Sequence, residues 1–377
     1  MAGSSHGAAS GLAALVSRLV TEVALTDGWR VAFEQVPRHL FVPDVLWAGE
    51  RNPLNRVDRT TDPQTWWELV CSDEALVTQF DDGAGGPDRP GEDWTSSSST
   101  PSIMATMLDH LDVAEGTRVL EIGTGTGWNA ALLCARLGEG NVTTVEIDPV
   151  LADQARAALH RAGFAATVIT GDGEAGWPAG APYDRVIVTA GVRRVPHAWV
   201  AQTRPGGRIV IPWRNSYASS LLCLDVAEDG SASGRFGEDV SFMWLRGQRP
   251  TEWPGRSGEE SVSPLDLWPS EPVGNLAVAL RLPDCYTVFR PDPDGQAYHF
   301  GVWVMHPDSG SWARIEVEPD RDIDYVYQGG PRRLWDEVEA AYAWWVEAGR
   351  PDHTRFGLTV TPDEQWTWLD EPAHRIP

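Results

Sequence analysis

Three glycines at alternate positions form the pattern in this sequence that most clearly suggests a ligand-binding loop. Gly123, Gly125 and Gly127 follow the short apolar run at residues 119–122. Glycine is needed where a ligand approaches the backbone too closely for a Cβ atom, and in tight turns with unusual dihedral angles. The GxGxG spacing differs from the GxGxxG of dinucleotide-binding folds, so it favours the methionine and ribose parts of S-adenosylmethionine over a pyrophosphate. We predict that these glycines and Thr124 contact that cofactor, with a plain strand-to-helix turn as the alternative.

Acidic residues follow the next two apolar segments at positions that suit the rest of the same cofactor. Glu146 comes about 20 residues after the glycines, where a carboxylate can accept hydrogen bonds from both ribose hydroxyls. Asp172, followed by Gly173, ends a third segment, where a carboxylate can bond the adenine amino group. Glu121 precedes the loop and either holds the amino group of the methionine part or braces the loop. Each acid alone is more often a solvated loop residue, but together they predict a cofactor crevice at one sheet edge.

Alternating helices and apolar strands are expected to position these residues. From residue 101 the two patterns alternate, which predicts a mostly parallel, doubly wound sheet of the α/β class, a Rossmann-like arrangement. The expected strands are 118–122, 142–146, 166–170, 185–189, 208–212 and 221–226, and the expected helices are 102–111, 128–137, 149–162 and 197–202. Apolar residues at helical spacing predict an N-terminal helical segment over 11–25 and 29–36.

The length of 377 residues suits two domains, and the composition changes near residue 250. Residues 1–250 are assigned to the domain with the doubly wound sheet, in which the acidic, Asp-, Gly- and Pro-rich stretch 51–95 is a loop or insertion. Residues 251–377 are assigned to a smaller α+β domain with a possible role in peptide recognition. Its expected elements are a hairpin at 298–317, a helix at 331–348 and a last hairpin at 356–368. Eight of the 19 tryptophans either line a peptide groove or form the apolar cores: Trp66, Trp67, Trp303, Trp312, Trp344, Trp345, Trp366 and Trp368.

Charge and composition exclude several classes of partner. The chain has 54 acidic residues and 30 basic residues, which are all Arg, for a net charge of −24. This charge argues against nonspecific binding to nucleic acid or to anionic membranes. No apolar run approaches the roughly 20 residues that span a bilayer, and the four cysteines form no CxxC motif. We therefore expect a cytoplasmic protein that acts as a monomer and holds no metal.

Several ordered motifs resemble those of protein-L-isoaspartate O-methyltransferases. The run Val-Pro-Arg-His-Leu-Phe-Val-Pro at 36–43 is similar to the N-terminal signature of that family, the run at 171–184 to its motif after the third strand, and Pro-Gly-Gly-Arg-Ile-Val-Ile-Pro at 205–212 to a late strand. The resemblance covers roughly residues 12–248, with a gap at 51–93. It implies a variant of the methyltransferase Rossmann fold, with S-adenosylmethionine as the methyl donor.

The resemblance also implies a substrate loop, whose family pattern is Thr-Ile-Ser-x-Pro before a helix. Aligned on Pro101, this chain has Ser97, Ser98 and Ser99 at the first three positions. Ser99 then falls on the active-site serine of the family, with Ser97 and Thr100 in support. Ser98 replaces an apolar residue and is placed among the cofactor contacts. Without the alignment, a run of serines is normally a flexible linker.

Two arginines stand where the family has small apolar residues after its fourth strand. Arg193 and Arg194 are either solvated or form a cationic patch that an acidic acceptor needs on this acidic protein. We include both as expected substrate contacts.

The implied chemistry is methylation of a carboxylate, which is already ionised at neutral pH and needs no strong base. Catalysis would then consist mainly of aligning the carboxylate and excluding water. Extended members of the family in actinobacteria accompany ribosomally synthesised peptides of the graspetide, lanthipeptide and lasso classes. Because this chain has an added region and a second domain, we expect it to esterify an aspartate in such a peptide, which leads to an aspartimide or an isoaspartate. The alternatives are repair of isoaspartate in damaged proteins, methylation of a small molecule, and a non-catalytic module that binds S-adenosylmethionine.

Overall fold

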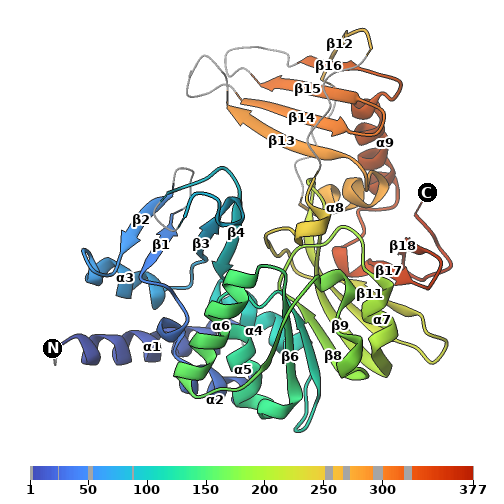
Figure 1. Cartoon of the computed structure of the whole chain (residues 1–377). Coiled ribbons are helices and arrows are strands. Elements are labelled where there is room, and N and C mark those ends of the chain that lie inside the picture. Colours follow the sequence, from blue (N-terminus) through green and yellow to red (C-terminus); the bar gives the residue numbers. More distant parts are fainter. Residues whose placement is uncertain are drawn as a thin grey trace.

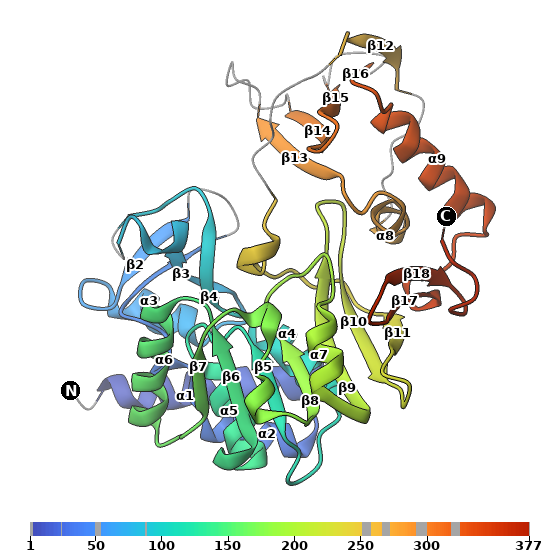
Figure 2. The same ribbon diagram turned by 45° about the vertical axis from the view of Figure 1, so that its right-hand side comes forward.

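Three β-sheets organise the described residues of the chain in the computed structural model shown in Figure 1. The structure describes residues 3–23, 25–49, 54–86, 89–250, 258–265, 272–291, 300–317 and 325–376. A nine-stranded sheet forms the centre, and a four-stranded and a five-stranded sheet accompany it. Figures 1 and 2 both place the two smaller sheets above the central sheet, each to one side.

The central sheet contains the six strands predicted between residues 118 and 226, a strand at 232–236 that was not predicted, and the last hairpin. They are β5 (Val119–Ile122), β6 (Val142–Glu146), β7 (Thr167–Thr170), β8 (Tyr183–Val188), β9 (Thr203–Arg214), β10 (Ser219–Val226), β11 (Ala232–Phe236), β17 (Phe356–Val360) and β18 (Gln365–Leu369). The order across the sheet is β18-β17-β11-β10-β9-β8-β5-β6-β7. The strands from β9 to β7 pair in parallel, whereas β10, β11, β17 and β18 pair antiparallel. The predicted doubly wound α/β sheet is confirmed.

Helices cover both faces of this sheet. They are α1 (Gly3–Glu22), α2 (Asp27–Gln35), α4 (Pro101–His110), α5 (Trp128–Leu137), α6 (Pro149–Ala162) and α7 (His197–Gln202). Successive side chains of a strand point to opposite faces. Val119 and Ile187 therefore join a core with α1, α2, α4, α5 and α6, whereas Leu120 and Val186 join a core with α7.

Capping residues explain why the predicted bounds of α6 are correct. The Asp148 side chain accepts hydrogen bonds from the backbone N–H groups of Val150 and Leu151, and Pro149 occupies the first turn. These are favourable N-terminal features, because the first N–H groups of a helix lack partners within it. Gly163 ends the helix with a φ of 85°, a left-handed conformation that glycine adopts readily.

The stretch 51–95, which we expect to be a loop or insertion, belongs to a folded unit in the structure. The elements are β1 (Val45–Ala48), β2 (Asn55–Asp58), α3 (Pro63–Val70), β3 (Leu76–Phe80) and β4 (Trp94–Ser98), and the sheet order is β2-β1-β3-β4. Leu46, Trp66 and Leu76 are fully buried in its small core. The Asp- and Gly-rich residues 81–86 lie only in the connection between β3 and β4. The expectation of a loop was therefore wrong for most of this stretch.

The C-terminal part forms a five-stranded antiparallel sheet with two helices. Its elements are β12 (Ser261–Pro264), α8 (Pro272–Arg281), β13 (Tyr286–Pro291), β14 (Phe300–His306), β15 (Ser311–Val317), β16 (Tyr325–Gly329) and α9 (Leu334–Glu347). The hairpin predicted at 298–317 is present from Phe300, with residues 298–299 outside the described residues, and the helix predicted at 331–348 is present. The last hairpin, β17–β18, is also present, but it pairs with β11 of the central sheet and not with this unit. Residues 356–369 therefore do not belong to a separate domain of residues 251–377.

Four of the eight tryptophans considered for a groove are part of the apolar cores. Trp66, Trp312, Trp345 and Trp368 are buried.

The four cysteines are free thiols. No helix among the described residues is long and apolar enough to cross a membrane.

Candidate active site

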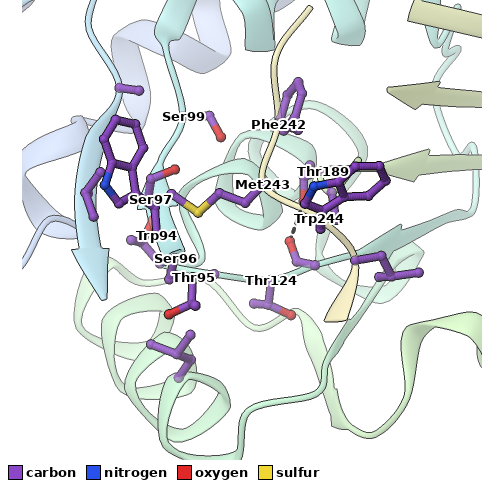
Figure 3. Close-up of a pocket in the computed structure, with 18 of the residues that line it drawn as sticks. Trp94, Thr95, Ser96, Ser97, Ser99, Thr124, Thr189, Phe242, Met243 and Trp244 are labelled. Atoms are coloured by element: carbon purple, nitrogen blue, oxygen red, sulfur yellow. Dashed lines mark hydrogen bonds between the residues drawn. The ribbon is translucent and has the colours of Figure 1, made fainter. Parts of the chain in front are cut away.

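A cavity of ≈ 940 Å³ lies where the carboxyl ends of β5 and β6 meet the four-stranded sheet. It is lined by the glycine loop after β5, by the end of β4 with the start of α4, and by residues 241–246 and 249–250, which follow β11. Figure 3 shows Ser97 and Ser99 on one wall and Met243 and Trp244 on another. Segments that are far apart in the sequence therefore enclose one space.

The glycine loop has the backbone that the sequence predicts. Gly123 has a φ of 97°, and a Cβ atom there would lie 2.8 Å from the Thr189 hydroxyl oxygen. Gly125 has a φ of 51° and lines the cavity with Gly123 and Thr124. Gly127 does not line the cavity, which corrects its expected ligand contact. With a φ of 86° at the start of α5, it allows the turn and the close approach of Ala155.

The acidic residues at the strand ends converge on the cavity. Glu146 is 7% exposed, and its carboxylate accepts hydrogen bonds from the N–H groups of Gly125 (2.9 Å) and Asp148 (3.1 Å). Burial raises the pKa of Glu146 above its ordinary value. Asp172 and Gly173 also line the cavity, and the Asp172 carboxylate accepts a hydrogen bond from the N–H group of Glu174 at 3.0 Å.

Glu121 lies beneath the loop and is fully buried. Its Oε1 accepts a hydrogen bond from the Asn129 side-chain amide at 2.7 Å, whereas its Oε2 has no partner. Burial raises the pKa of Glu121 to about 7. Beside it, the hydroxyls of Thr124 and Thr144 are hydrogen-bonded at 2.6 Å. A buried acceptor without a partner is costly, so this arrangement is suited to a cationic or donor group of a ligand.

The serine run is the end of strand β4 and not a flexible linker. Ser97, Ser99 and Thr100 line the cavity. A Cβ atom on Gly125 would lie 3.7 Å from the Ser97 carbonyl oxygen, so this strand end lies directly against the glycine loop. Ser98 was expected among the cofactor contacts, but it does not line the cavity. It is 1% exposed, and its hydroxyl accepts a hydrogen bond from Arg38, because strand alternation turns it away from Ser97.

The two arginines expected to bind the substrate lie outside this cavity. Arg193 and Arg194 line a separate cavity of ≈ 310 Å³. Arg193 donates a hydrogen bond to the Tyr286 hydroxyl and lies 3.9 Å from the Asp284 carboxylate, both in the C-terminal unit. Arg193 therefore contacts the C-terminal unit, and both arginines line the smaller cavity instead of the main one.

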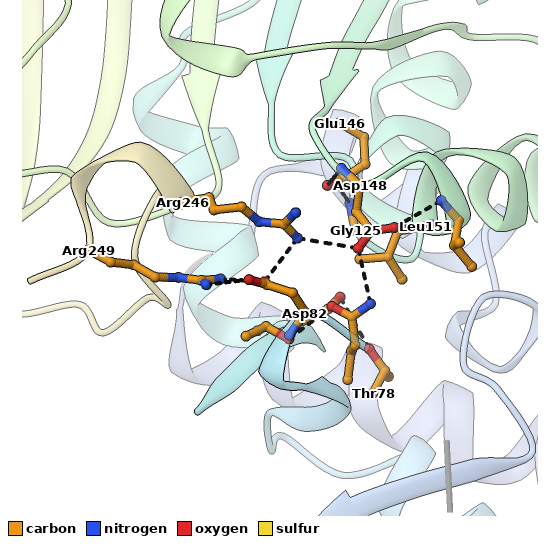
Figure 4. Close-up of polar contacts among 12 residues, drawn as sticks. Thr78, Asp82, Gly125, Glu146, Asp148, Leu151, Arg246 and Arg249 are labelled. Carbon is orange, nitrogen blue, oxygen red and sulfur yellow. Dashed lines mark hydrogen bonds and ion pairs between the residues drawn. The ribbon is translucent and has the colours of Figure 1, made fainter. Parts of the chain in front are cut away.

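Three other arginines line the main cavity, and two of them belong to a charged network shown in Figure 4. Arg246, which begins the 3-10 helix η6 (Arg246–Gln248), pairs with Asp82 at 3.0 Å and with Asp148 at 3.3 Å. Arg249 pairs with both carboxylate oxygens of Asp82 at 2.7 and 2.8 Å. We name these four residues the ionic bridge. It connects the β3–β4 connection, the segment after β11 and the start of α6 across the rim of the cavity.

An aromatic wall completes the cavity and was not predicted from the sequence. Phe242, Met243 and Trp244 follow β11, and Trp94, which is 41% exposed, begins β4. The third arginine, Arg214, lies with its guanidinium 4.4 Å from the centre of the Trp244 ring. No periodic pattern marks residues 237–250, so only the folded chain shows that they line the site. Within the described ranges, no cluster of His, Cys, Asp or Glu could hold a metal ion.

The chain is similar in sequence to one family of enzymes. The family model for "Protein-L-isoaspartate(D-aspartate) O-methyltransferase (PCMT)" matches residues 86–249. The protein-L-isoaspartate O-methyltransferase of Hyperthermus butylicus is 34% identical over 247 residues, which cover 62% of this chain and 88% of the relative. Protein-L-isoaspartate O-methyltransferase 2 of Archaeoglobus fulgidus is 33% identical over 237 residues, which cover 62% of this chain and 92% of the relative. The chain belongs to the protein-L-isoaspartate O-methyltransferase family.

A solved protein-L-isoaspartate O-methyltransferase shares the fold. Its TM-score is 0.57 at 21% identity, and the alignment covers 96% of this chain and 100% of that chain. The likeness therefore includes the part of this chain after residue 250. As a member of the family, the chain is an S-adenosylmethionine-dependent carboxyl O-methyltransferase, so the predicted family, enzyme class and cofactor are confirmed. The predicted link to ribosomally made peptides stays a prediction.

The residues around the cavity fit S-adenosylmethionine. The glycine loop leaves space where side chains would otherwise stand, and the unpartnered Oε2 of Glu121 provides a buried acceptor beside it. Glu146 and Asp172 line the same cavity, and Leu151 adds apolar surface to it. A cofactor with one cationic end, a ribose and an aromatic base matches this set of groups.

Proposed function

We propose that this methyltransferase esterifies the free carboxylate of an L-isoaspartyl residue in a polypeptide, which is the methyl transfer for which its relatives are named and which would serve repair. The observation that carries the proposal is the position of the Ser97–Thr100 strand end against the glycine loop in one cavity. The family resemblance assigns this strand end to the acceptor and the glycine loop to the methyl donor. The two substrates would therefore meet in one cavity.

Four acidic and apolar residues are proposed to hold the cofactor, which supplies a methyl group on a sulfonium. Glu146 would accept hydrogen bonds from the ribose hydroxyls, and Asp172 from the adenine amino group. Glu121 would accept one from the ammonium group of the methionine part. Leu151 would pack against the adenine ring. These roles fix the donor before the acceptor enters.

The acceptor needs orientation more than activation. A carboxylate with its ordinary pKa of about 4 is ionised at neutral pH, so no general base has to remove a proton. We propose that the Ser99 hydroxyl donates a hydrogen bond to this carboxylate and aligns it, supported by Ser97 and Thr100. Trp244 and Phe242 would exclude water, which otherwise stabilises the separated charges that the transfer neutralises.

The product ester has a defined chemical fate. The backbone nitrogen of the following residue attacks the ester carbonyl carbon, a C–N bond forms, and methoxide leaves and takes up the amide proton as methanol. The result is a five-membered succinimide. Opening of this ring by water gives aspartate or isoaspartate, so repeated cycles convert isoaspartate to aspartate.

Methylation of matched peptides tests the proposal. Two peptides that differ only in one L-isoaspartyl or L-aspartyl residue are incubated with enzyme and S-adenosylmethionine, and mass spectrometry follows ester and succinimide. We expect product from the isoaspartyl peptide alone. Ser99→Ala should lower turnover about 100-fold, because removing one oriented hydrogen-bond donor typically costs that much. Ser102→Ala, on α4 outside the cavity lining, is the matched control. Equal turnover of the Ser99→Ala variant and the wild type would remove Ser99 from the mechanism.

The second candidate is esterification of one aspartate in a dedicated ribosomally made peptide. The observation that favours it is the aromatic wall of Trp94, Phe242 and Trp244, since large aromatic side chains are suited to selecting particular peptide neighbours. Length alone does not favour it, because the alignment with the solved protein-L-isoaspartate O-methyltransferase also extends over the C-terminal part. Product from the aspartyl peptide but not from the isoaspartyl peptide would favour this candidate over repair.

A further inference from the structure

Arg38 is a buried cation that lies behind the end of β4, the strand that leads to Ser99. It begins the 3-10 helix η1 (Arg38–Leu40), within the motif at residues 36–43. The side chain is 1% exposed and does not line the cavity. It therefore has no direct contact with either substrate, and the methyl-transfer mechanism above gives it no role.

The guanidinium of Arg38 holds the strand end that carries the active-site serine. Its Nε donates a hydrogen bond to the Ser98 hydroxyl at 3.0 Å, and its Nη2 donates to the carbonyl oxygens of Ser98 and Ser99, both at 2.9 Å. The same guanidinium reaches the carbonyl oxygens of Glu74 (2.7 Å) and Ser72 (3.3 Å), in the segment before β3. The planar guanidinium thus links the end of β4 to the segment before β3 through five hydrogen bonds.

Burying this guanidinium costs folding free energy, which argues that its position has a role beyond packing. Within the part of the chain that the structure describes, no carboxylate lies within ion-pair distance of Arg38. Burial lowers the pKa of its guanidinium to about 9, against the opposing effect of the nearby negative charges of Asp73 and Glu74. A buried charge without a direct ion pair is costly unless hydrogen bonds satisfy it. Here the carbonyl groups of the strand end provide that compensation, so the charge and the strand hold each other in place.

Arg38 also contacts Trp128, a residue that lines the cavity next to the glycine loop. Its guanidinium carbon lies 5.5 Å from the centre of the Trp128 ring, and Trp128 is the first residue of α5, directly after the glycine loop. Trp128 lines the cavity and donates a hydrogen bond from its indole N–H to the Val36 carbonyl at 3.1 Å. The segment at 36–38 therefore contacts both the end of β4 and the start of α5.

We propose that Arg38 is a positioning residue for methyl transfer, which fixes the backbone of Ser98 and Ser99 so that the Ser99 hydroxyl meets the acceptor carboxylate. The proposal rests on the role proposed above for Ser99. A misplacement of about 1 Å in a reacting geometry can cost about 100-fold in rate. Loss of the guanidinium should therefore appear in turnover and not in cofactor affinity.

The test compares Arg38→Lys with Arg185→Lys. Arg185 is the matched control: its guanidinium also binds backbone carbonyls, those of Leu111 (2.7 Å) and Asp112 (2.8 Å), but it does not line the cavity or contact β4. We expect Arg38→Lys to lower kcat about 100-fold with S-adenosylhomocysteine affinity within about threefold. Arg185→Lys should leave kcat within about threefold of the wild-type value. Its loss of thermal stability should be similar to that of Arg38→Lys.

A double-mutant cycle separates positioning from general destabilisation. If Arg38 acts through Ser99, Arg38→Lys should lower turnover less than about threefold in a Ser99→Ala background. Effects that multiply independently would overturn the proposal. Ser98→Ala, which removes one acceptor and leaves the guanidinium intact, should lower kcat about fivefold, and it replaces Arg38→Lys if that variant does not fold. An unchanged kcat for Ser98→Ala would then count against the proposal.

Hydrogen exchange tests whether Arg38 holds the backbone of β4, and it needs no acceptor peptide. In the wild type and the variants, exchange of the backbone amides at 94–102 is followed by mass spectrometry, with 119–127 as the internal reference. We expect Arg38→Lys to accelerate exchange only in the first segment by at least about tenfold. Unchanged exchange at 94–102 would show that Arg38 does not hold the strand. If the wild type methylates neither peptide, the proposed function fails, while the exchange result still decides for or against Arg38.

Discussion

The buried carboxyl group of Glu121 should make the stability of the ligand-free enzyme depend on pH. Its pKa is about 7 in the folded chain because burial disfavours the charged form, whereas an unfolded chain has the ordinary value of 4.5. The folded state therefore binds a proton that the unfolded state releases between these values. The contribution to stability is fully present below about pH 4.5 and is lost as the pH rises through about 7. The variant Glu121→Gln keeps the shape and removes the titration.

The magnitude follows from the difference between the two pKa values. At about 1.4 kcal/mol for each pH unit, a pKa of about 7 in place of 4.5 corresponds to about 3 kcal/mol. Between about pH 5 and about pH 7.5, roughly 2 kcal/mol of this should be lost. Because Gln cannot ionise, the free energy of unfolding of the variant should not include this loss.

The assay is urea unfolding of ligand-free wild type and Glu121→Gln at both pH values, with Glu139→Gln as control. Glu139 is an exposed acid in the turn before β6. When the pH is raised, the free energy of unfolding of Glu121→Gln should increase by about 2 kcal/mol relative to that of the wild type. The free energy of unfolding of Glu139→Gln should change with pH as that of the wild type does. The same pH dependence in all three proteins would refute the raised pKa and the argument from burial.

Cofactor binding gives an independent check on the same residue. If ionised Glu121 accepts a hydrogen bond from an ammonium group, wild-type affinity for S-adenosylhomocysteine should rise with pH up to about 7 and then level off. Glu121→Gln should bind about tenfold more weakly at neutral pH, with a flat profile, as measured by isothermal titration calorimetry. Wild-type affinity in the variant would show that Glu121 only braces the loop.

Two further predictions concern the charged residues around the cavity. Asp82→Asn breaks the ionic bridge, whose Asp82 side chain is 36% exposed. Melting temperature should change little, because exposed ion pairs contribute about 0–1 kcal/mol, while stopped-flow fluorescence should show S-adenosylhomocysteine leaving several times faster. Raising the salt should accelerate release from the wild type in the same way, and salt-independent release would count against the bridge. Arg193→Ala should leave kcat on a short peptide within about twofold, because Arg193 lines only the smaller cavity; a tenfold loss would restore its predicted role.

Features that depend on local sequence were predictable. The glycine loop, the acids at the strand ends and the bounds of α5, α6 and α7 follow from turns, caps and apolar periodicity within a few residues. Asp148 and Gly163 mark the ends of α6 in this way. Such signals are short-range, so they need no knowledge of the remaining fold.

Features that depend on distant contacts were not predictable in the same way. A run of serines has no apolar alternation that could phase a strand, so the opposite orientations of Ser97 and Ser98 become clear only from the contact with Arg38. The strands β1 to β4 are only four or five residues long, which gives a weak pattern, and their small core with Trp66 forms only on folding. Likewise, alternation at 356–368 predicts a hairpin but not that its partner is β11.

The pairing of β17 with β11 gives the C-terminal unit two covalent connections to the central sheet. The chain leaves the sheet after β11 and comes back to it at Phe356. A stop codon after residue 250 would therefore remove two strands of the central sheet. The edge of β11 would then be unpaired, and exposed edge strands promote aggregation. Excising residues 258–350 and splicing the flanking segments would keep the hairpin in place. Any change in acceptor choice after that excision could then be attributed to the removed unit and not to a damaged sheet.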